Sequence, residues 1–253
     1  MKSHGSVNNL VNIESSSDPD LQAVIFDCDG ILVNTEPLHY RAFQEVLAPL
    51  GMGHDYESYM EHFVGFDDRD AFIYAFKEAG LYLAPTTLDR LMEAKALALL
   101  DLIGQGVPGF PGVGELVAEL MNRGVLMAVA SGALRHEIDA FIASLGLNGV
   151  FHAIVAADEV KKSKPDPETY LLAIERLRQL QGSRLLDPMN CIAIEDTPAG
   201  IRSAKSAGLL VIAVTNSFSF SELTEADKVI DSLSEFGFPE MLELLKLRRQ
   251  AQP

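Results

Sequence analysis

Five short, continuously apolar runs constrain the fold of this chain more than any other feature of its sequence. They are residues 23–26, 125–130, 153–156, 191–194 and 209–214. Each run is rich in Val, Ile, Ala or Leu and lacks the polar alternation of a strand that has one face in water. Strands of this kind are typical of a parallel sheet covered on both faces. The sequence therefore predicts an α/β protein built on a buried parallel sheet.

Helical patterns separate the last four runs. They cover residues 113–123, 134–145, 167–180 and 198–207, and a further pattern at 238–249 predicts one last helix. Glycines, which commonly end helices, follow three of these patterns. Regular alternation of strand and helix predicts a doubly wound, Rossmann-like sheet with right-handed crossovers.

The stretch between the first two runs breaks this alternation. From Thr35 to about Gly106 we predict no buried strand, but three helices at 37–50, 68–79 and 86–103. A segment rich in Pro and Gly then returns the chain to the sheet. We therefore expect an α/β core of residues 21–36 and 106–253, with a small all-α cap of residues 37–105 inserted after the first strand. The Ser-, Asn- and Asp-rich residues 1–20 are predicted to be a disordered tail.

Charge and composition exclude several classes of protein. The 253 residues carry 20 Lys and Arg against 36 Asp and Glu, a net charge of −16. Such an acidic surface repels phosphate backbones, so we expect no nucleic-acid partner. Only two cysteines are present, which disfavours a disulfide framework. Without an apolar stretch of about 18 residues or a signal-peptide pattern, we expect no membrane partner and a cytoplasmic location. No feature demands more than a monomer.

Polar side chains follow four of the predicted strands. They are Asp27, Asp29 and Gly30 after the first, Ser131 and Gly132 after the second, Lys164 beyond the third, and Glu195 and Asp196 after the fourth. In open α/β sheets, ligands bind beyond the carboxyl ends of the strands. We therefore expect these residues to converge on one site.

Clustered carboxylates repel one another, so a hard cation is their natural partner. Mg²⁺ prefers oxygen ligands and usually binds through one or two carboxylates together with a substrate phosphate. Asp27 and Asp196 could be these ligands, with Glu195 reaching the ion through water. The sequence therefore predicts Mg²⁺ as the cofactor.

The same residues suit phosphoryl transfer. Asp27 can attack phosphorus to form an aspartyl phosphate. Asp29 can protonate the leaving oxygen and later deprotonate a water. Ser131 and Lys164 can hold the phosphoryl oxygens, and Pro165 favours an extended Lys164. Taken singly, each motif also fits a structural role, such as a turn, a surface lysine or a helix start. Their joint occurrence at four strand ends favours catalysis.

Four segments carry a resemblance to a known superfamily. Residues 27–36, Ser131, residues 164–167 and residues 195–200 resemble the four motifs of the haloacid dehalogenase superfamily, over nearly the whole chain from Leu21 on. The subgroup that it is most similar to contains the α-helical-cap sugar-phosphate phosphatases related to β-phosphoglucomutase.

The resemblance implies a role for each motif. Asp27 would be nucleophile and metal ligand, and Asp29 would be acid/base with its backbone carbonyl on the metal. Ser131, Gly132 and Lys164 would bind phosphate, while Asp196 and Glu195 would hold the metal, Asp196 directly. Dehalogenases of the superfamily generally lack the second aspartate, so Asp29 argues against carbon–halogen chemistry.

Two departures separate this chain from the mutase. The mutase has a Ser-x-Ser-Lys-type turn where this chain has Ser131-Gly132-Ala133-Leu134. Its cap arginine is represented here by Arg69, one position later and among three aspartates. Both departures favour a phosphatase, although Arg135 could partly replace the missing lysine.

We therefore predict a Mg²⁺-dependent phosphomonoester hydrolase that acts on a small phosphorylated metabolite, a sugar phosphate, with Arg69 and His39 of the cap contacting substrate. The alternatives are a phosphosugar mutase of the β-phosphoglucomutase type and a non-catalytic metabolite-binding protein.

Overall fold

The computed structural model of the chain describes residues 21–63, 66, 68–180 and 186–251. The predicted disordered tail of residues 1–20 lies outside these ranges. Among the described residues, no helix is both long and apolar enough to cross a membrane. Both cysteines, Cys28 and Cys191, are buried as free thiols.

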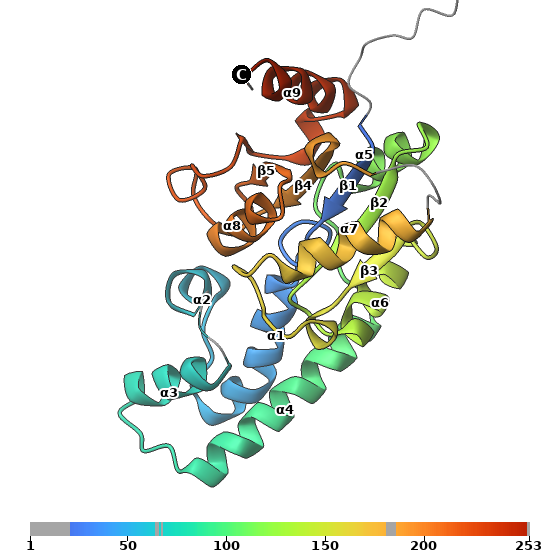
Figure 1. Cartoon of the computed structure of the whole chain (residues 1–253). Helices are drawn as coiled ribbons and strands as arrows, with labels where there is room; N and C mark the ends of the chain where they lie inside the picture. Colours follow the sequence, from blue (N-terminus) through green and yellow to red (C-terminus); the bar gives the residue numbers. More distant parts are fainter. Residues whose placement is uncertain (1–20, 64–65, 67, 181–185, 252–253) are drawn as a thin grey trace, which may run out of the picture.

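A parallel sheet with the strand order β3-β2-β1-β4-β5-β6 forms the core of the molecule (Figure 1). Its strands are β1 (Ala23–Phe26), β2 (Leu126–Ala130), β3 (Ala153–Val155), β4 (Cys191–Glu195), β5 (Leu210–Val214) and β6 (Lys228–Ile230). The predicted α/β fold class is confirmed. β6 was not predicted, because a three-residue edge strand that begins with an exposed lysine has no apolar run.

Helices cover both faces of the sheet. α5 (Val113–Asn122), α6 (Arg135–Ser144) and α9 (Phe238–Gln250) pack on one face, and α7 (Glu168–Leu180) and α8 (Pro198–Ser206) pack on the other. Successive residues of β1 alternate between the two hydrophobic clusters, with Val24 and Phe26 on one side and Ala23 and Ile25 on the other. This two-sided burial explains why the strands have no polar alternation. The predicted helices agree with these bounds to within one or two residues.

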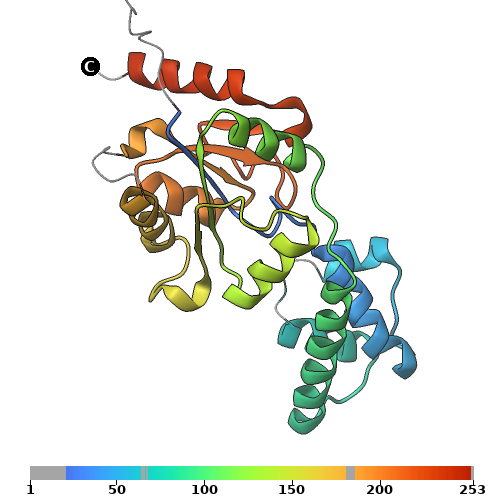
Figure 2. The ribbon, with the colours of Figure 1, turned by 90° about the vertical axis from the view of Figure 1, so that its right-hand side faces the viewer.

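In the part of the chain that the structure describes, four α-helices lie between β1 and α5, beyond one end of the sheet (Figure 2). They are α1 (Glu36–Leu47), α2 (Tyr56–His62), α3 (Asp68–Glu78) and α4 (Pro85–Gly104). The short 3₁₀ helices are η1 (Ala48–Leu50), η2 (Ala157–Glu159), η3 (Pro188–Asn190) and η4 (Leu233–Glu235).

The helical insert has a hydrophobic cluster of its own, centred on Phe43, Leu47, Phe72 and Phe76. This separate core supports our proposal that residues 37–105 form a cap. α2 was missed, because its sequence lacks a long apolar stripe. Asp55 caps its N-terminus, because the Asp55 side chain accepts a hydrogen bond from the backbone N–H of Ser58 at 2.8 Å.

Candidate active site

The register of the sheet brings the first and fourth motifs together. Phe26 lies opposite Val129 of β2 and Ile194 of β4, so Asp27 and Glu195 lie at the same edge. The chain turns away after Asp27 through Gly30, whose φ of +81° lies in the left-handed region. A Cβ atom at Gly30 would also lie 1.8 Å from Asp196 Oδ2. Glycine is therefore required here both by the turn and by the close approach of Asp196.

Lys164 joins the carboxylates of two strand ends. Its Nζ lies 2.5 Å from Asp27 Oδ1 and 2.6 Å from Glu195 Oε1. Burial opposes the charge on Lys164, but the two carboxylates outweigh it and raise the pKa of Lys164 above its usual value. Burial also raises the pKa of Asp27, against the opposing effect of Lys164. The lysine is therefore a fixed positive charge at the predicted nucleophile.

The fully buried side chain of Glu195 is held by donors on both oxygens. Oε1 accepts from Lys164 and, at 2.7 Å, from the hydroxyl of Tyr170. Oε2 accepts from the backbone N–H of Asp196 and from Thr197 Oγ1, both at 3.2 Å. The sequence did not single out Tyr170, because a tyrosine at an apolar position of a helix looks like core packing. Its contact makes it part of the site.

One carboxylate oxygen of Asp196 accepts a hydrogen bond, and the other has no hydrogen-bond partner among the described residues. Oδ2 accepts a short hydrogen bond from Ser217 Oγ, whereas the buried Oδ1 has no hydrogen-bond partner. Burial and the neighbouring Glu195 raise the pKa of Asp196 to about 7. Ser217 follows β5, after which no motif was recognised, so it could not be predicted from the sequence.

Asp27, Glu195 and Asp196 each offer a carboxylate oxygen, and these atoms lie within 4.8 Å of one another. Lys164 supplies one positive charge against these three carboxylates. The unpartnered Asp196 Oδ1 adds a buried acceptor that lacks a donor. A hard divalent cation with oxygen ligands fits this set of groups.

Asp29 lies just outside this cluster. Thr35 Oγ1 donates to Asp29 Oδ1 at 2.8 Å. Burial nevertheless raises the pKa of Asp29, because it outweighs the opposing effect of that hydrogen bond. Asp29 borders two cavities, one of about 530 Å³ on the side of Asn216 and one of about 240 Å³ on the side of Gly132. The predicted acid/base therefore lies where a leaving group has room.

The second motif lies beside β1. Ser131 is almost fully buried at the end of β2, where its N–H donates to Val155 O at 3.0 Å. Its hydroxyl accepts from the N–H of Ala133 at 3.0 Å. Gly132 lines the smaller cavity together with Asp29. Ser131 and Gly132 are thus placed at the same sheet edge as the other motifs.

His39 is the predicted cap residue that reaches the site, since it lines the smaller cavity with Asp29. Its Nδ1 lies 2.9 Å from Lys95 Nζ, which also lies 2.6 Å from Asp68 Oδ1. Burial and the charge of Lys95 lower the pKa of His39 to about 4, although Asp68 opposes them. The neutral imidazole therefore accepts a hydrogen bond from Lys95. The sequence missed Lys95, because a lysine within a helix usually lies in solvent.

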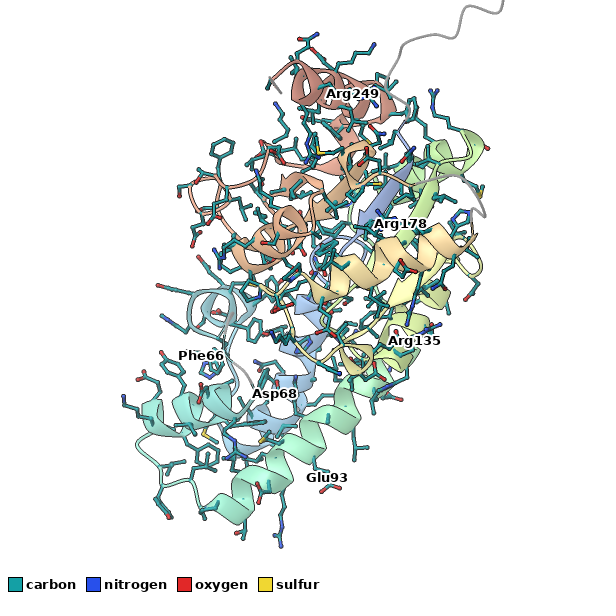
Figure 3. The ribbon with its side chains drawn as sticks, viewed as in Figure 1. Phe66, Asp68, Glu93, Arg135, Arg178 and Arg249 are labelled. Carbon is teal, nitrogen blue, oxygen red and sulfur yellow. The ribbon has the colours of Figure 1, made fainter. Side chains whose placement is uncertain are left out.

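Two arginines lie away from the cavities. Arg69 is exposed on α3 and lines neither cavity, so its contact with substrate stays a prediction. Figure 3 places Arg135 at α6. Its guanidinium lies 3.0 Å from Asp139 Oδ1 and 3.9 Å from Glu159 Oε2. The guanidinium of Arg135 therefore pairs with partly exposed carboxylates of the α/β part of the molecule.

This chain is similar to known proteins. Residues 24–214 match the family model described as haloacid dehalogenase-like hydrolase. The chain is 32% identical to the protein CbbY of Rhodobacter capsulatus, over 85% of this chain and 95% of that protein. It is also 32% identical to the fructose-1-phosphate phosphatase YqaB of Escherichia coli, over 76% of this chain and 95% of that protein.

A solved structure shows the same fold. A variant of CbbY from Rhodobacter sphaeroides, in complex with xylulose-1,5-bisphosphate, superimposes with a TM-score of 0.66 at 30% identity. The match covers 88% of this chain and 99% of that one. The chain therefore belongs to the haloacid dehalogenase-like hydrolase family.

Proposed function

We propose that this protein is a Mg²⁺-dependent phosphatase that removes phosphate from a small phosphorylated sugar through an aspartyl phosphate on Asp27. One observation carries the proposal. The Asp27 carboxylate lies against Lys164 and beside Asp196, while the hydrogen-bonded Asp29 borders the adjacent cavities. Nucleophile, fixed positive charge, metal ligands and proton donor are the groups that phosphoryl transfer needs.

In the first half-reaction, a carboxylate oxygen of Asp27 forms a bond to phosphorus as the bond to the leaving oxygen breaks. Asp29 gives its proton to that oxygen, and burial raises the pKa of Asp29, which favours the protonated form relative to an exposed aspartate. In the second half-reaction, the Asp29 carboxylate takes a proton from water. The water oxygen attacks phosphorus, which releases inorganic phosphate and frees Asp27.

Ser131, Gly132 and Lys164 bind the phosphoryl oxygens in this proposal. Asp27, Asp196 and the backbone carbonyl of Asp29 hold Mg²⁺, which supplies charge neutralisation at those oxygens when bound. Glu195 already accepts donors on both oxygens, so we assign it the outer position, where it orients the direct ligands.

Relatives that are sugar and hexitol phosphatases support the sugar class of the substrate. They include phosphatases of fructose 1-phosphate and of hexitol phosphates. His39 and Arg69 are the proposed cap contacts to the sugar. The mutase alternative loses support, because Arg135 is already engaged by Asp139 and Glu159. The cytoplasmic location and the monomeric state expected from the sequence stay predictions.

A screen of sugar phosphates with Mg²⁺, scored by phosphate release, tests the proposal. We expect turnover of at least one sugar phosphate and of p-nitrophenyl phosphate, and no turnover after exhaustive chelation. A coupled glucose-6-phosphate dehydrogenase assay with β-glucose 1-phosphate and a bisphosphate primer tests for mutase activity. Sustained primer-dependent NADPH formation would establish the mutase instead.

A further inference from the structure

The position of Asp29 limits where the body of the substrate can lie. If Asp29 protonates the leaving oxygen, as in the proposed function on which this inference rests, that oxygen lies within hydrogen-bond distance of its carboxyl group. Among the described residues, Asp29 borders two cavities into which the rest of the leaving group can extend. The charge of these two cavities therefore decides which leaving groups the enzyme accepts.

The charged side chains that line the larger cavity are all carboxylates. They belong to Asp29, Glu36, Asp196 and Glu222. In the proposed function Asp196 binds Mg²⁺ and Asp29 carries the proton, so Glu36 and Glu222 are the negative charges that face the body of the substrate. The remaining lining combines amide and hydroxyl groups, such as Asn34 and Asn216, with apolar surface from Met60, Phe110 and Phe218. Amides and hydroxyls can bind sugar hydroxyl groups, and apolar rings can cover the C–H faces of a sugar.

The smaller cavity has no compensating cation either. Its charged lining residues are Asp29 and Glu137, and its one basic residue is His39. The ring of His39 faces the ammonium group of Lys95 at 2.9 Å, which disfavours a second proton on the imidazole. Among the described residues, neither lining includes a lysine or an arginine.

The lysines Lys164 and Lys95 each already pair with carboxylates. Lys164 lies between Asp27 and Glu195, and it serves the phosphoryl group that is transferred. Lys95 is 1% exposed and forms an ion pair with Asp68, which Figure 3 places among the cap helices. A second phosphate on the substrate would therefore meet carboxylates and no unpaired lysine in either cavity.

From these linings we infer that the enzyme acts on monophosphates whose remaining body is an uncharged sugar or polyol, and that it discriminates against sugar bisphosphates. In this respect it differs from its relative CbbY, a variant of which has been solved with xylulose-1,5-bisphosphate. A second phosphate brings about two further negative charges at neutral pH. Like charges brought together at a binding site disfavour the wrong ligand.

Matched substrate pairs test the inference. Fructose 1-phosphate and fructose 1,6-bisphosphate share the same scissile group, as do the other monophosphates found in the screen and their bisphosphates. We expect kcat/KM for the bisphosphate to be at least about tenfold lower in each hydrolysed pair. Inhibition of p-nitrophenyl phosphate hydrolysis gives a second measurement, in which each bisphosphate should inhibit more weakly than its monophosphate.

Neutral variants show whether charge is the cause. Glu36→Gln keeps an acceptor for the hydroxyl of Tyr59, which now donates to Glu36 at 2.9 Å. Together with Glu222→Gln, it should narrow the gap between bisphosphate and monophosphate. Glu93→Gln is the matched control, because Glu93 is exposed on the outer side of α4 (Figure 3) and should leave the ratio unchanged.

The outcomes separate this inference from the proposed function. Hydrolysis of bisphosphates at equal or higher kcat/KM than of monophosphates overturns the inference and leaves the phosphatase standing. An unchanged ratio in the Glu36→Gln/Glu222→Gln variant, with thermal melting showing a folded protein, overturns the charge explanation. Failure to release phosphate from any sugar phosphate or from p-nitrophenyl phosphate instead overturns the proposed function.

Discussion

The candidate active site and the proposed cap each contain a lysine that pairs with a carboxylate, Lys164 with 13% of its side chain exposed and Lys95 with 1%. Lys164 lies between Asp27 and Glu195 at the ends of two strands, and Lys95 lies between Asp68 and His39 among three helices. Taken singly, each lysine looks like an ordinary solvent-exposed residue in the sequence. Only Lys164 was predicted as a functional residue.

The two lysines differ in how far their secondary structure determines the direction of the side chain. A parallel sheet brings all its carboxyl ends to one edge, so a residue directly after a strand is placed by topology alone. A helical residue points in one of many directions around its axis, and its burial depends on which neighbours pack there. Sequence motifs therefore locate the chemistry of the core but leave the polar contacts of the cap open.

The largest expected effect is at the nucleophile. Asp27→Asn should lower kcat by roughly 10⁴-fold or more, since an amide is a poor nucleophile and the nucleophile belongs to an interdependent set of groups. The thermal midpoint should change little, because Glu195 still neutralises Lys164 and the amide oxygen can still accept from it. Phosphate release assays and thermal melting of the purified variant check both points. Substantial turnover by a clean preparation would rule out the covalent mechanism.

Metal removal tests the carboxylate cluster directly. EDTA should abolish turnover, and Mg²⁺ should restore it. Mg²⁺ at about 100 times its Kd should also raise the free energy of unfolding by about 2.7 kcal/mol. The effect should depend on pH. The pKa of Asp196 rises from its ordinary value of about 3.9 to about 7 in the folded chain.

Between these two values, the folded chain holds a proton that the unfolded chain has released. Stability without metal should therefore fall as pH rises through this window. Mg²⁺ should raise the thermal midpoint more at pH 8 than at pH 5.5. An equal shift at both pH values would count against the ionised cluster as the metal site.

Asp29→Ala should lower kcat by about 10²–10⁴-fold for sugar phosphates, the usual contribution of general acid–base catalysis. The loss should be smaller for p-nitrophenyl phosphate, because nitrophenolate leaves without a proton. Steady-state kinetics with both substrates decide the point. An equal loss for both would remove Asp29 from the acid role.

These core predictions were accessible from the sequence because five apolar runs placed the strands and four motifs followed their ends. β6 and α2 were missed because neither has a long apolar pattern, and Ser217 because β5 carries no recognised motif after it. Tyr170 looked like core packing, yet its hydroxyl binds Glu195. The residues that were missed bind buried side chains of distant segments, and such partnerships depend on packing that local patterns do not encode.

Ser217 offers a milder test of the core. Its hydroxyl fixes Asp196 Oδ2 and leaves Oδ1 free for the metal. Ser217→Ala should weaken Mg²⁺ binding by about 10- to 100-fold, the usual cost of losing an outer-shell partner. Titration calorimetry measures this affinity without turnover, and Ser217→Thr, which keeps the hydroxyl, should restore it. Unchanged affinity in Ser217→Ala would show that Asp196 is oriented by other contacts.

The smallest effect on turnover is expected in the cap, where the two partners of the buried ion pair differ in exposure. Lys95 is 1% exposed, whereas the side chain of Asp68 is 34% exposed. Asp68→Asn strands a buried ammonium group and should destabilise the fold by about 3 kcal/mol. Lys95→Met leaves the Asp68 carboxylate accessible to water and fills the space of the lysine side chain with apolar atoms. This substitution should therefore lower the free energy of unfolding by only about 1 kcal/mol.

Urea unfolding of both single variants and of the double variant gives a double-mutant cycle. In the double variant, Lys95→Met should recover most of the stability lost through Asp68→Asn. A smaller loss of stability in Asp68→Asn than in Lys95→Met would mean that water reaches the ammonium group of Lys95 in the folded protein. Lys95 and Lys164 would then differ only in how strongly their carboxylate partners hold them.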